Sequence, residues 1–373
     1  MNNYWSGIFG QPKLKFFFET LIANKSFPQA IIIEGTKGCG KDAISARFAQ
    51  LLNLAHQNKL TETIEQSRYP FSAPWIKYVV PLPTGANDSG HEDPLQGLPE
   101  STVQDILEQI KEKNNNPYHK MEIEAAKVIK LSSIRDVRRH LSLSSAPNLR
   151  RTVLISEADK MNEESQNSLL KDIEEPPENT TFILTTDNIE FLRETIISRC
   201  WVLKATPLDD ADIIQLLTQS FDISLEDATN VAPLAEGSIF EAQNLCNENI
   251  SKLKETTVSF LRLASMNRVH EAFQNIEKSI IKEGTQTIAL FLRLIILWLG
   301  DAHKNRYGAE NLYFNQHNAE FTKYNQRFSG VDLSEISRKI DKYLQSLYRN
   351  NANPSIIIHN LFYLIPDILK VKS

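Results

Sequence analysis

The chain has few cysteines and no excess of basic residues. Its three cysteines, Cys39, Cys200 and Cys246, lie far apart, which excludes a four-cysteine zinc site and gives no disulfide framework. The formal net charge is −5, so any contact with nucleic acid must come from a local basic patch. This composition fits a reducing compartment, and we expect a cytoplasmic location.

Long hydrophobic runs are also scarce. Residues 1–5 lack the basic and then apolar segments of a signal peptide. The most apolar run near the C-terminus, residues 288–299, contains Arg293 and is too short to cross a bilayer. We therefore expect no membrane partner, and the 373 residues are enough for two or three domains.

Short apolar runs alternate with helical patterns in the N-terminal half of the chain. They occupy residues 30–34, 127–131, 152–156 and 181–185. Buried parallel strands have this continuous apolar character, and their alternation with helices predicts an α/β domain with a parallel sheet. Residues 57–125 interrupt the pattern with prolines, a polar stretch and a charged helix at about 101–113, and we interpret them as a partly flexible insertion.

The strand signal ends near residue 207. Three short helices are predicted at residues 208–219, 224–234 and 238–247, and the pattern stays helical from 249 to the end. The predicted domains are an α/β domain over 1–206, a small helical domain over 207–247 and a larger helical domain over 248–373.

The most informative motif is a phosphate-binding loop with one altered position. Residues 35–42 read Gly-Thr-Lys-Gly-Cys-Gly-Lys-Asp, between a predicted strand and a predicted helix. Gly35, Gly38 and Gly40 let backbone N–H groups approach a phosphate, and Lys41 would reach the β- and γ-phosphates. Asp42 stands where a hydroxyl normally holds Mg²⁺. Its carboxylate would repel phosphate, so we expect weak or absent binding of ATP or ADP.

A second motif follows the run at 152–156. In phosphoryl-transfer sites, an acid at such a strand end organises Mg²⁺ and the next acid polarises the attacking water. Here Ser156 takes the first position and Glu157 keeps the second. An ordinary strand end with capping residues is an equal interpretation of this stretch alone.

A third stretch, residues 163–200, is specific to one family. It contains Leu-Leu-Lys-Asp-Ile-Glu-Glu-Pro-Pro, then a strand ending in Thr-Thr, then Ser-Arg-Cys. This combination resembles the AAA+ clamp-loader subunits of bacterial DNA polymerase III, gamma/tau and delta-prime. The resemblance is specific over about 5–52 and 127–206 and does not cover 57–125. It implies a RecA-like AAA+ P-loop domain, a small helical lid and a C-terminal helical collar.

The resemblance also implies roles for particular residues. Lys41 matches the phosphate-loop lysine, and Glu157 matches the catalytic glutamate, here vestigial. Thr186 lies at the position that senses the γ-phosphate. Arg199 matches the arginine finger that is offered in trans to the ATP of a neighbouring subunit. A surface arginine in a loop is the alternative interpretation, and no metal site is expected.

Three departures from the family pattern affect the same nucleotide. Asp42 and Ser156 remove the two Mg²⁺ ligands, and Phe240 stands where active subunits carry a phosphate-sensing arginine. Phosphoryl transfer depends almost entirely on such charge neutralisation. Because Arg199 is intact, the pattern points to delta-prime, a subunit that needs no cofactor and has no ATPase activity of its own.

The expected function is to help load the DNA sliding clamp on primed DNA. The implied partners are the gamma/tau and delta subunits, the clamp, and primer–template DNA through the assembly. An ATP-hydrolysing gamma/tau-type subunit and an AAA+ scaffold outside replication are the alternatives.

A basic cluster offers a candidate contact with DNA. Arg135, Arg138 and Arg139 could share one face of a helix and meet DNA phosphates. A solvated helix face is an equal alternative.

Overall fold

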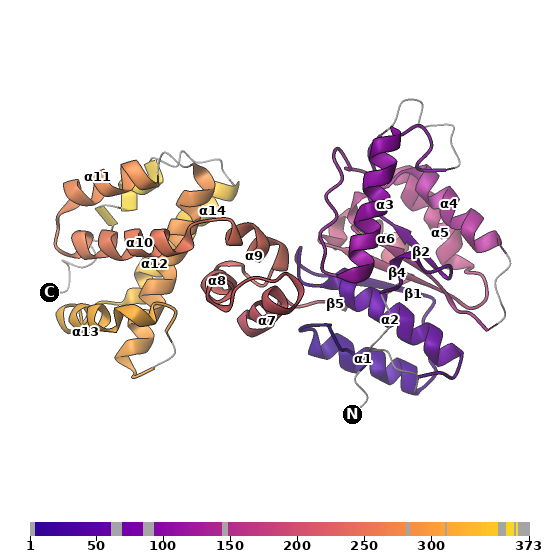
Figure 1. Ribbon diagram of the computed structural model, residues 1–373, viewed down its shortest axis with the longest axis horizontal. Coiled ribbons are helices and arrows are strands. Elements are labelled where there is room, and N and C mark those ends of the chain that lie inside the picture. The colour runs from indigo at the N-terminus through magenta and orange to yellow at the C-terminus, as the bar shows by residue number, and fades with distance from the viewer. Residues whose placement is uncertain are drawn as a thin grey trace. The chain divides into compact units, whose positions relative to one another are not determined.

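The computed structural model describes residues 4–60, 69–84, 93–143, 148–280, 284–309, 312–349, 356–361 and 363–364. The chain divides into two compact units. Figure 1 colours the chain by residue number from the N-terminus to the C-terminus. The first comprises Met1–Ala228 and Ala235–Gln243, and the second comprises Thr229–Leu234 and Asn244–Ser373. The three-domain division stays a prediction, because the small helical region is shared between these units.

The first unit is built on a parallel sheet, which confirms the predicted α/β fold class. Its described residues form five strands in the order β2-β3-β4-β1-β5, and every neighbouring pair is parallel. The strands are β1 (Ala30–Glu34), β2 (Ile76–Val79), β3 (Arg151–Ile155), β4 (Thr180–Thr186) and β5 (Trp201–Lys204). The central β4 is buried at all seven positions, as expected for a strand covered on both faces.

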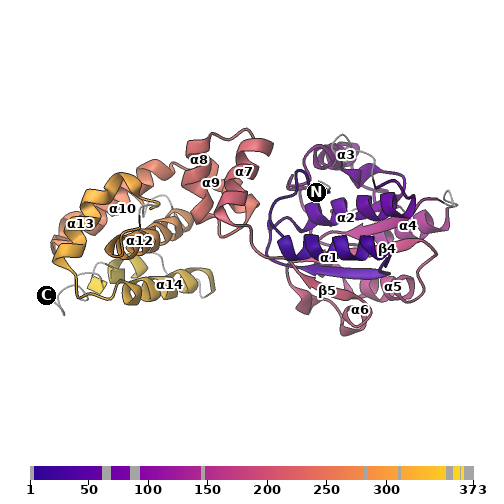
Figure 2. The ribbon, with the colours of Figure 1, turned by 90° about the horizontal axis from the view of Figure 1, so that it is seen from below.

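Helices cover both faces of this sheet, as Figure 2 shows. On one face α1 (Pro12–Ala23) packs on α2 (Lys41–His56), where the rings of Phe18 and Phe48 stack with centroids 3.9 Å apart. On the other face, α4 (Leu131–Ser142), α5 (Glu163–Glu174) and α6 (Glu194–Ile197) share one buried apolar cluster with the sheet. Helix α5 ends at Glu174 because two prolines follow at 176 and 177.

Two sequence predictions in this unit are wrong. Residues 127–131 do not form a strand. Val128 and Ile129 make only isolated bridges, and α4 begins at Leu131. The sheet instead takes β2 from the segment interpreted as an insertion. Lys77 interrupts the apolar character of β2, and as an edge strand it is only half-buried at two of four positions, so no continuous apolar run marks it.

The remainder of residues 57–125 lies around this added strand. The predicted charged helix is confirmed as α3 (Glu100–Asn115), which packs near a short 3₁₀ helix at Pro70–Ser72. The polar stretch at 85–92, predicted to be flexible, lies outside the described residues, as does 61–68.

The predicted helices after residue 207 are confirmed. They are α7 (Asp210–Ser220), α8 (Leu225–Val231) and α9 (Ile239–Cys246). The carboxylate of Asp209 caps α7 by accepting a hydrogen bond of 2.8 Å from the N–H of Asp212.

Helices make up the described part of the second unit. They include α10 (Ile250–Ser265), α11 (Val269–Ser279), α12 (Thr285–Arg306), α13 (Asn318–Arg327) and α14 (Leu333–Arg349). Helix α12 is central, because its Phe291 meets Phe260 of α10 and its Trp298 meets Phe321 of α13.

Helix α12 extends beyond the apolar run at 288–299. Its 22 residues are long and apolar enough to cross a membrane by length and composition alone. However, 67% of its most apolar window is buried within the protein, as in the core helix of a helical domain.

Candidate functional site

Three strands bring the sequence motifs to one edge of the sheet. The phosphate loop follows β1, Ser156 and Glu157 follow β3, and Thr185 to Asp187 lie at the end of β4. Because the strands are parallel, their carboxyl ends meet, and in open α/β sheets this is the edge where ligands bind.

The glycines of the phosphate loop have distinct roles. Gly38 and Gly40 adopt φ values of 77° and 89°, which are costly for residues that carry a Cβ. Gly35 does not need a positive φ. A Cβ on it would lie 2.9 Å from the backbone oxygen of Ala205, so this position requires close packing. A Cβ on Gly40 would meet the ring of Tyr118 at 3.0 Å.

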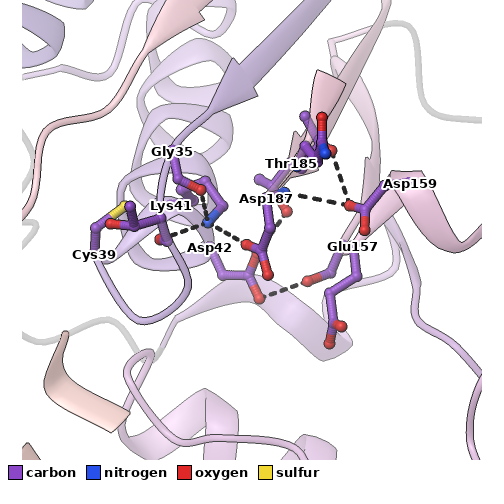
Figure 3. A network of polar contacts seen from close by, with 12 residues as sticks. Gly35, Cys39, Lys41, Asp42, Glu157, Asp159, Thr185 and Asp187 are labelled. Atoms are coloured by element: carbon purple, nitrogen blue, oxygen red, sulfur yellow. Dashed lines mark hydrogen bonds and ion pairs between the residues drawn. The ribbon is translucent and has the colours of Figure 1, made fainter. Parts of the chain in front are cut away.

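The amine of Lys41 is fully occupied by the protein itself. It donates to the carbonyl oxygens of Gly35 and Thr36 at 2.8 and 2.9 Å and forms a 2.7 Å ion pair with Asp187 (Figure 3). A lysine ammonium has three donors, so these contacts use all of them. The side chain of Lys41 is only 8% exposed.

The carboxylate of Asp42 is held by a cage of polar groups. Its Oδ2 accepts hydrogen bonds from Ser156 at 2.7 Å and Tyr78 at 3.4 Å, and its Oδ1 accepts one from Thr185 at 2.9 Å. Lys113 of α3 forms an ion pair with Oδ2 at 3.0 Å. Figure 3 shows Asp42 directed toward the ends of β3 and β4.

This cage determines the charge of Asp42. Burial opposes ionisation of the carboxyl, but the charge of Lys113 and the hydrogen bonds from Ser156, Lys113 and Thr185 outweigh it. The pKa of Asp42 is therefore lower than its ordinary value. Burial and the neighbouring Asp42 raise the pKa of Tyr78, whose phenol stays neutral.

The three departures that the sequence groups together lie around one cavity. Asp42, Ser156 and Phe240 all line a cavity of about 160 Å³ beside the phosphate loop. One wall comes from α3 and the segment after it, including Lys113 and Tyr118. The hydroxyl of Tyr118 accepts a 2.7 Å hydrogen bond from the N–H of Phe9, which fixes this wall to the N-terminal segment.

Thr186 does not line this cavity. Its hydroxyl donates to Asp159 at 2.8 Å and accepts from the N–H of Asn188 at 3.1 Å. Its neighbours Thr185 and Asp187 line the cavity instead, because side chains alternate along a strand. Glu157 does line it, in the left-handed backbone region at φ 52°, and pairs with Lys160.

Arg199 lies outside the cavity, after α6. Its guanidinium forms a 2.7 Å ion pair with Glu174 and donates to the carbonyl of Thr195 at 2.9 Å. The side chain is 40% exposed, so it is accessible while held in place. Glu174 belongs to the Glu-Glu-Pro-Pro sequence, so the two most specific motifs of the chain meet here.

The basic cluster is largely engaged within the protein. Arg138 forms 2.9 Å hydrogen bonds with both carboxylate oxygens of Asp172, and Arg139 bonds Asp136. Of the three arginines in the predicted DNA contact, Arg135 and Arg139 are exposed, and Arg138 is half-buried.

Sequence reasoning missed Lys113, Tyr78 and Asp187. Lys113 and Tyr78 come from residues 57–125, which the sequence motifs do not cover, so no motif marks them. Asp187 follows the Thr-Thr strand end directly, and that adjacency was the available signal.

The groups that would hold a magnesium-bound nucleotide contact protein groups in this structure. Lys41 directs its three donors to Gly35, Thr36 and Asp187, and the oxygen of Asp42 that faces Ser156 binds the ammonium of Lys113. In the described part of the chain, no group of three or more His, Cys, Asp or Glu side chains is placed to hold a metal ion.

Comparisons with known proteins agree with the motifs. A family model described as DNA polymerase III, delta subunit, matches residues 93–209. The gamma subunit of Buchnera aphidicola (subspecies Acyrthosiphon pisum) is 24% identical over 253 residues, which cover 66% of this chain and 59% of that subunit. The delta-prime subunit of Bacillus subtilis is 29% identical over 172 residues, covering 45% of this chain and 52% of that subunit.

These matches support the clamp-loader family of DNA polymerase III subunits. They include gamma, tau and delta-prime relatives and do not separate one kind from another. The chain spans 59% of the length of the Buchnera gamma subunit. Among solved structures, a gamma-subunit-related protein from Thermotoga maritima aligns over 95% of this chain and 99% of its own, with 16% identity and a TM-score of 0.38.

Proposed function

We propose that the chain is a delta-prime-type subunit of a DNA polymerase III clamp loader. In this proposal it hydrolyses no ATP itself and offers Arg199 to the ATP of a neighbouring subunit. The observation that carries the proposal is the contrast between two cations. Lys41 directs all three donors to protein groups, two in its own loop and one at Asp187, whereas Arg199 is exposed and held by Glu174.

The proposed partners are the gamma/tau and delta subunits, the sliding clamp, and primer–template DNA through the assembly. The family model and the relatives support this class of partner, and the identity of each partner belongs to the proposal. Loading of a clamp on DNA would take place in the cytoplasm. We propose that no cofactor is required and that nucleotide binding is weak or absent.

The first test is turnover by the purified chain. We expect no ATPase activity above background, because the loop lysine and both metal-ligand positions are engaged by protein groups. Turnover that is lost in a Lys41→Ala variant would contradict the proposal. It would favour a gamma/tau-type ATPase, the kind that several relatives represent.

The second test concerns Arg199 in a reconstituted loader. An arginine finger contributes on the order of 10³–10⁵ in rate at its site. Arg199→Ala should therefore abolish ATP turnover at the one site that Arg199 faces. The total ATPase rate of the loader should fall by the fraction that this site contributes. Assembly, measured by size-exclusion chromatography, should be unchanged.

Arg193→Ala provides the matched control, since Arg193 is 41% exposed, close to the 40% of Arg199, and lies at the other end of the short helix α6. Equal ATPase rates for the Arg199→Ala, Arg193→Ala and unaltered loaders would reject the finger role.

A further inference from the structure

The segment at residues 57–125 supplies a cation to the phosphate loop. The sequence motifs do not cover this segment, the matching family model includes it only from residue 93 on, and the proposed function gives it no role. Lys113, in the last turn of α3, reaches the loop and is only 4% exposed. Its ammonium lies 3.0 Å from the Oδ2 of Asp42 and donates to the carbonyl of His119 at 3.0 Å.

The position of this ammonium is significant because of the two residues beside it. In a phosphate loop, the residue after the lysine and the acid after the next motif strand together organise the divalent cation. Here these positions are Asp42 and Ser156, and they bond each other at 2.7 Å through the same Oδ2 that Lys113 contacts. A metal ion held by Asp42 and Ser156 would need that oxygen.

We infer that the ammonium of Lys113 is a built-in cation that takes the place of the divalent metal ion at Asp42 and keeps the metal out. A second cation near Asp42 would be repelled by the ammonium in surroundings that are mostly buried. The aspartate and the lysine are thus complementary charges, because a buried carboxylate needs a paired cation.

The structure around α3 keeps Lys113 in place. Asn114, the next residue, bonds Ser72 through its side chain, and its carbonyl accepts from the N–H of Tyr69. Tyr118 then fixes the following segment to Phe9. This anchoring holds the ammonium at Asp42 without any ligand. The inference concerns the chain's own pocket, so it holds whether or not the chain joins a clamp loader.

The test uses the full-length protein with Mn²⁺ alone as the probe, measured by the electron paramagnetic resonance signal of the free ion. The variants are Lys113→Ala, the double variant Lys113→Ala/Asp42→Asn, and Lys111→Ala as the control. Lys111 is an exposed lysine on the same helix. A pH of about 8 is chosen because it lies far above 3.8, the ordinary pKa of the Asp42 carboxyl.

Lys113→Ala should bind Mn²⁺ at least about tenfold more tightly than the unaltered protein. Lys111→Ala should match the unaltered protein, and the double variant should lose the gain. The inference is overturned if the unaltered protein binds Mn²⁺ as tightly as Lys113→Ala, or if the gain survives in the double variant.

Lys113→Gln serves if the alanine variant does not fold. The amide can still donate to Asp42 and to the carbonyl of His119 but carries no charge, so the same gain is expected and its absence overturns the inference. Failure here would remove one reason for expecting no ATPase activity but would leave the role of Arg199 unchanged, and failure of the Arg199 test would leave this inference unchanged, so the two failures are distinguishable.

Discussion

At the scale of single residues, the pair of Asp42 and Lys113 is the feature most open to measurement. The side chains are 19% and 4% exposed, so each charge depends on the other. Removing one partner of a buried ion pair leaves an uncompensated charge, which costs about 3–5 kcal/mol. Asp42 and Lys113 therefore stabilise the first unit only when both are present.

We predict that Asp42→Asn lowers the free energy of unfolding by about 3 kcal/mol, because Lys113 is then buried without a counter-charge. Urea denaturation at neutral pH measures this. Glu108→Gln, which removes an exposed carboxylate from α3, is the control and should change stability by less than about 0.5 kcal/mol. Equal stability of the two variants would contradict the account of the pair.

The same pair predicts a dependence on pH. The pKa of Asp42 is lowered in the folded protein from an ordinary value of 3.8, so the unfolded chain binds this proton more readily. The contribution of Asp42 to stability is complete above pH 3.8 and is lost as the pH falls through the lowered folded pKa. The stability difference between the unaltered protein and Asp42→Asn should narrow only in that acid range. A difference that already narrows near neutral pH would argue against an ionised Asp42.

At the scale of elements, one ion pair joins α4 to α5. Arg138 bonds both carboxylate oxygens of Asp172 and also donates to the carbonyl of Ser168. Its side chain is 39% exposed, which limits the value of the pair through solvent screening. The geometry favours a role in packing over a contact with DNA.

Arg138→Ala should accordingly reduce the free energy of unfolding by about 1 kcal/mol. Arg135→Ala, an exposed neighbour on the same helix, should leave stability within about 0.5 kcal/mol of the unaltered protein. Thermal denaturation followed by circular dichroism compares the two. If both variants lose the same stability, the pair between Arg138 and Asp172 does not join the helices as described.

The burial and apolar character of each strand explain which strands could be predicted from the sequence. Strands β1, β3 and β4 were predicted because they are buried and continuously apolar. Strand β2 could not be predicted, because Lys77 interrupts its apolar character and pairs with the buried Asp136 of α4. Residues 127–131 have the composition of a strand but form only isolated bridges with other segments. Whether such a segment becomes a strand depends on its tertiary pairing.

At the scale of the whole molecule, the chain consists of two compact units. Each has its own buried apolar core, the first around β1 and β4 and the second around α12. Units with separate cores can unfold separately, so a single free energy of unfolding need not describe the chain.

We predict two calorimetric unfolding transitions for the full-length protein. Asp42→Asn should lower the midpoint of one of them and leave the other within about 1 °C, since Asp42 lies in the first unit only. Differential scanning calorimetry distinguishes two separate transitions from one cooperative transition. A single transition that shifts as a whole would mean that the two units unfold cooperatively.

The sequence by itself determined the parallel α/β class, the helical C-terminal part, and the residues of the altered phosphate loop. These are local properties, because hydrophobic period, glycine spacing and short motifs are written in contiguous residues. The sequence also grouped Asp42, Ser156 and Phe240, and the structure places all three around one cavity.

Only the tertiary structure decided what neutralises Asp42 and what occupies Lys41. Lys113 and Asp187 are 71 and 146 residues away from these partners along the chain, at 113 − 42 and 187 − 41. No local pattern encodes such pairs, because a charge finds its partner through the packing of α3 and β4 against the loop. That packing pairs the carboxylate of Asp42 with Lys113 and the ammonium of Lys41 with Asp187.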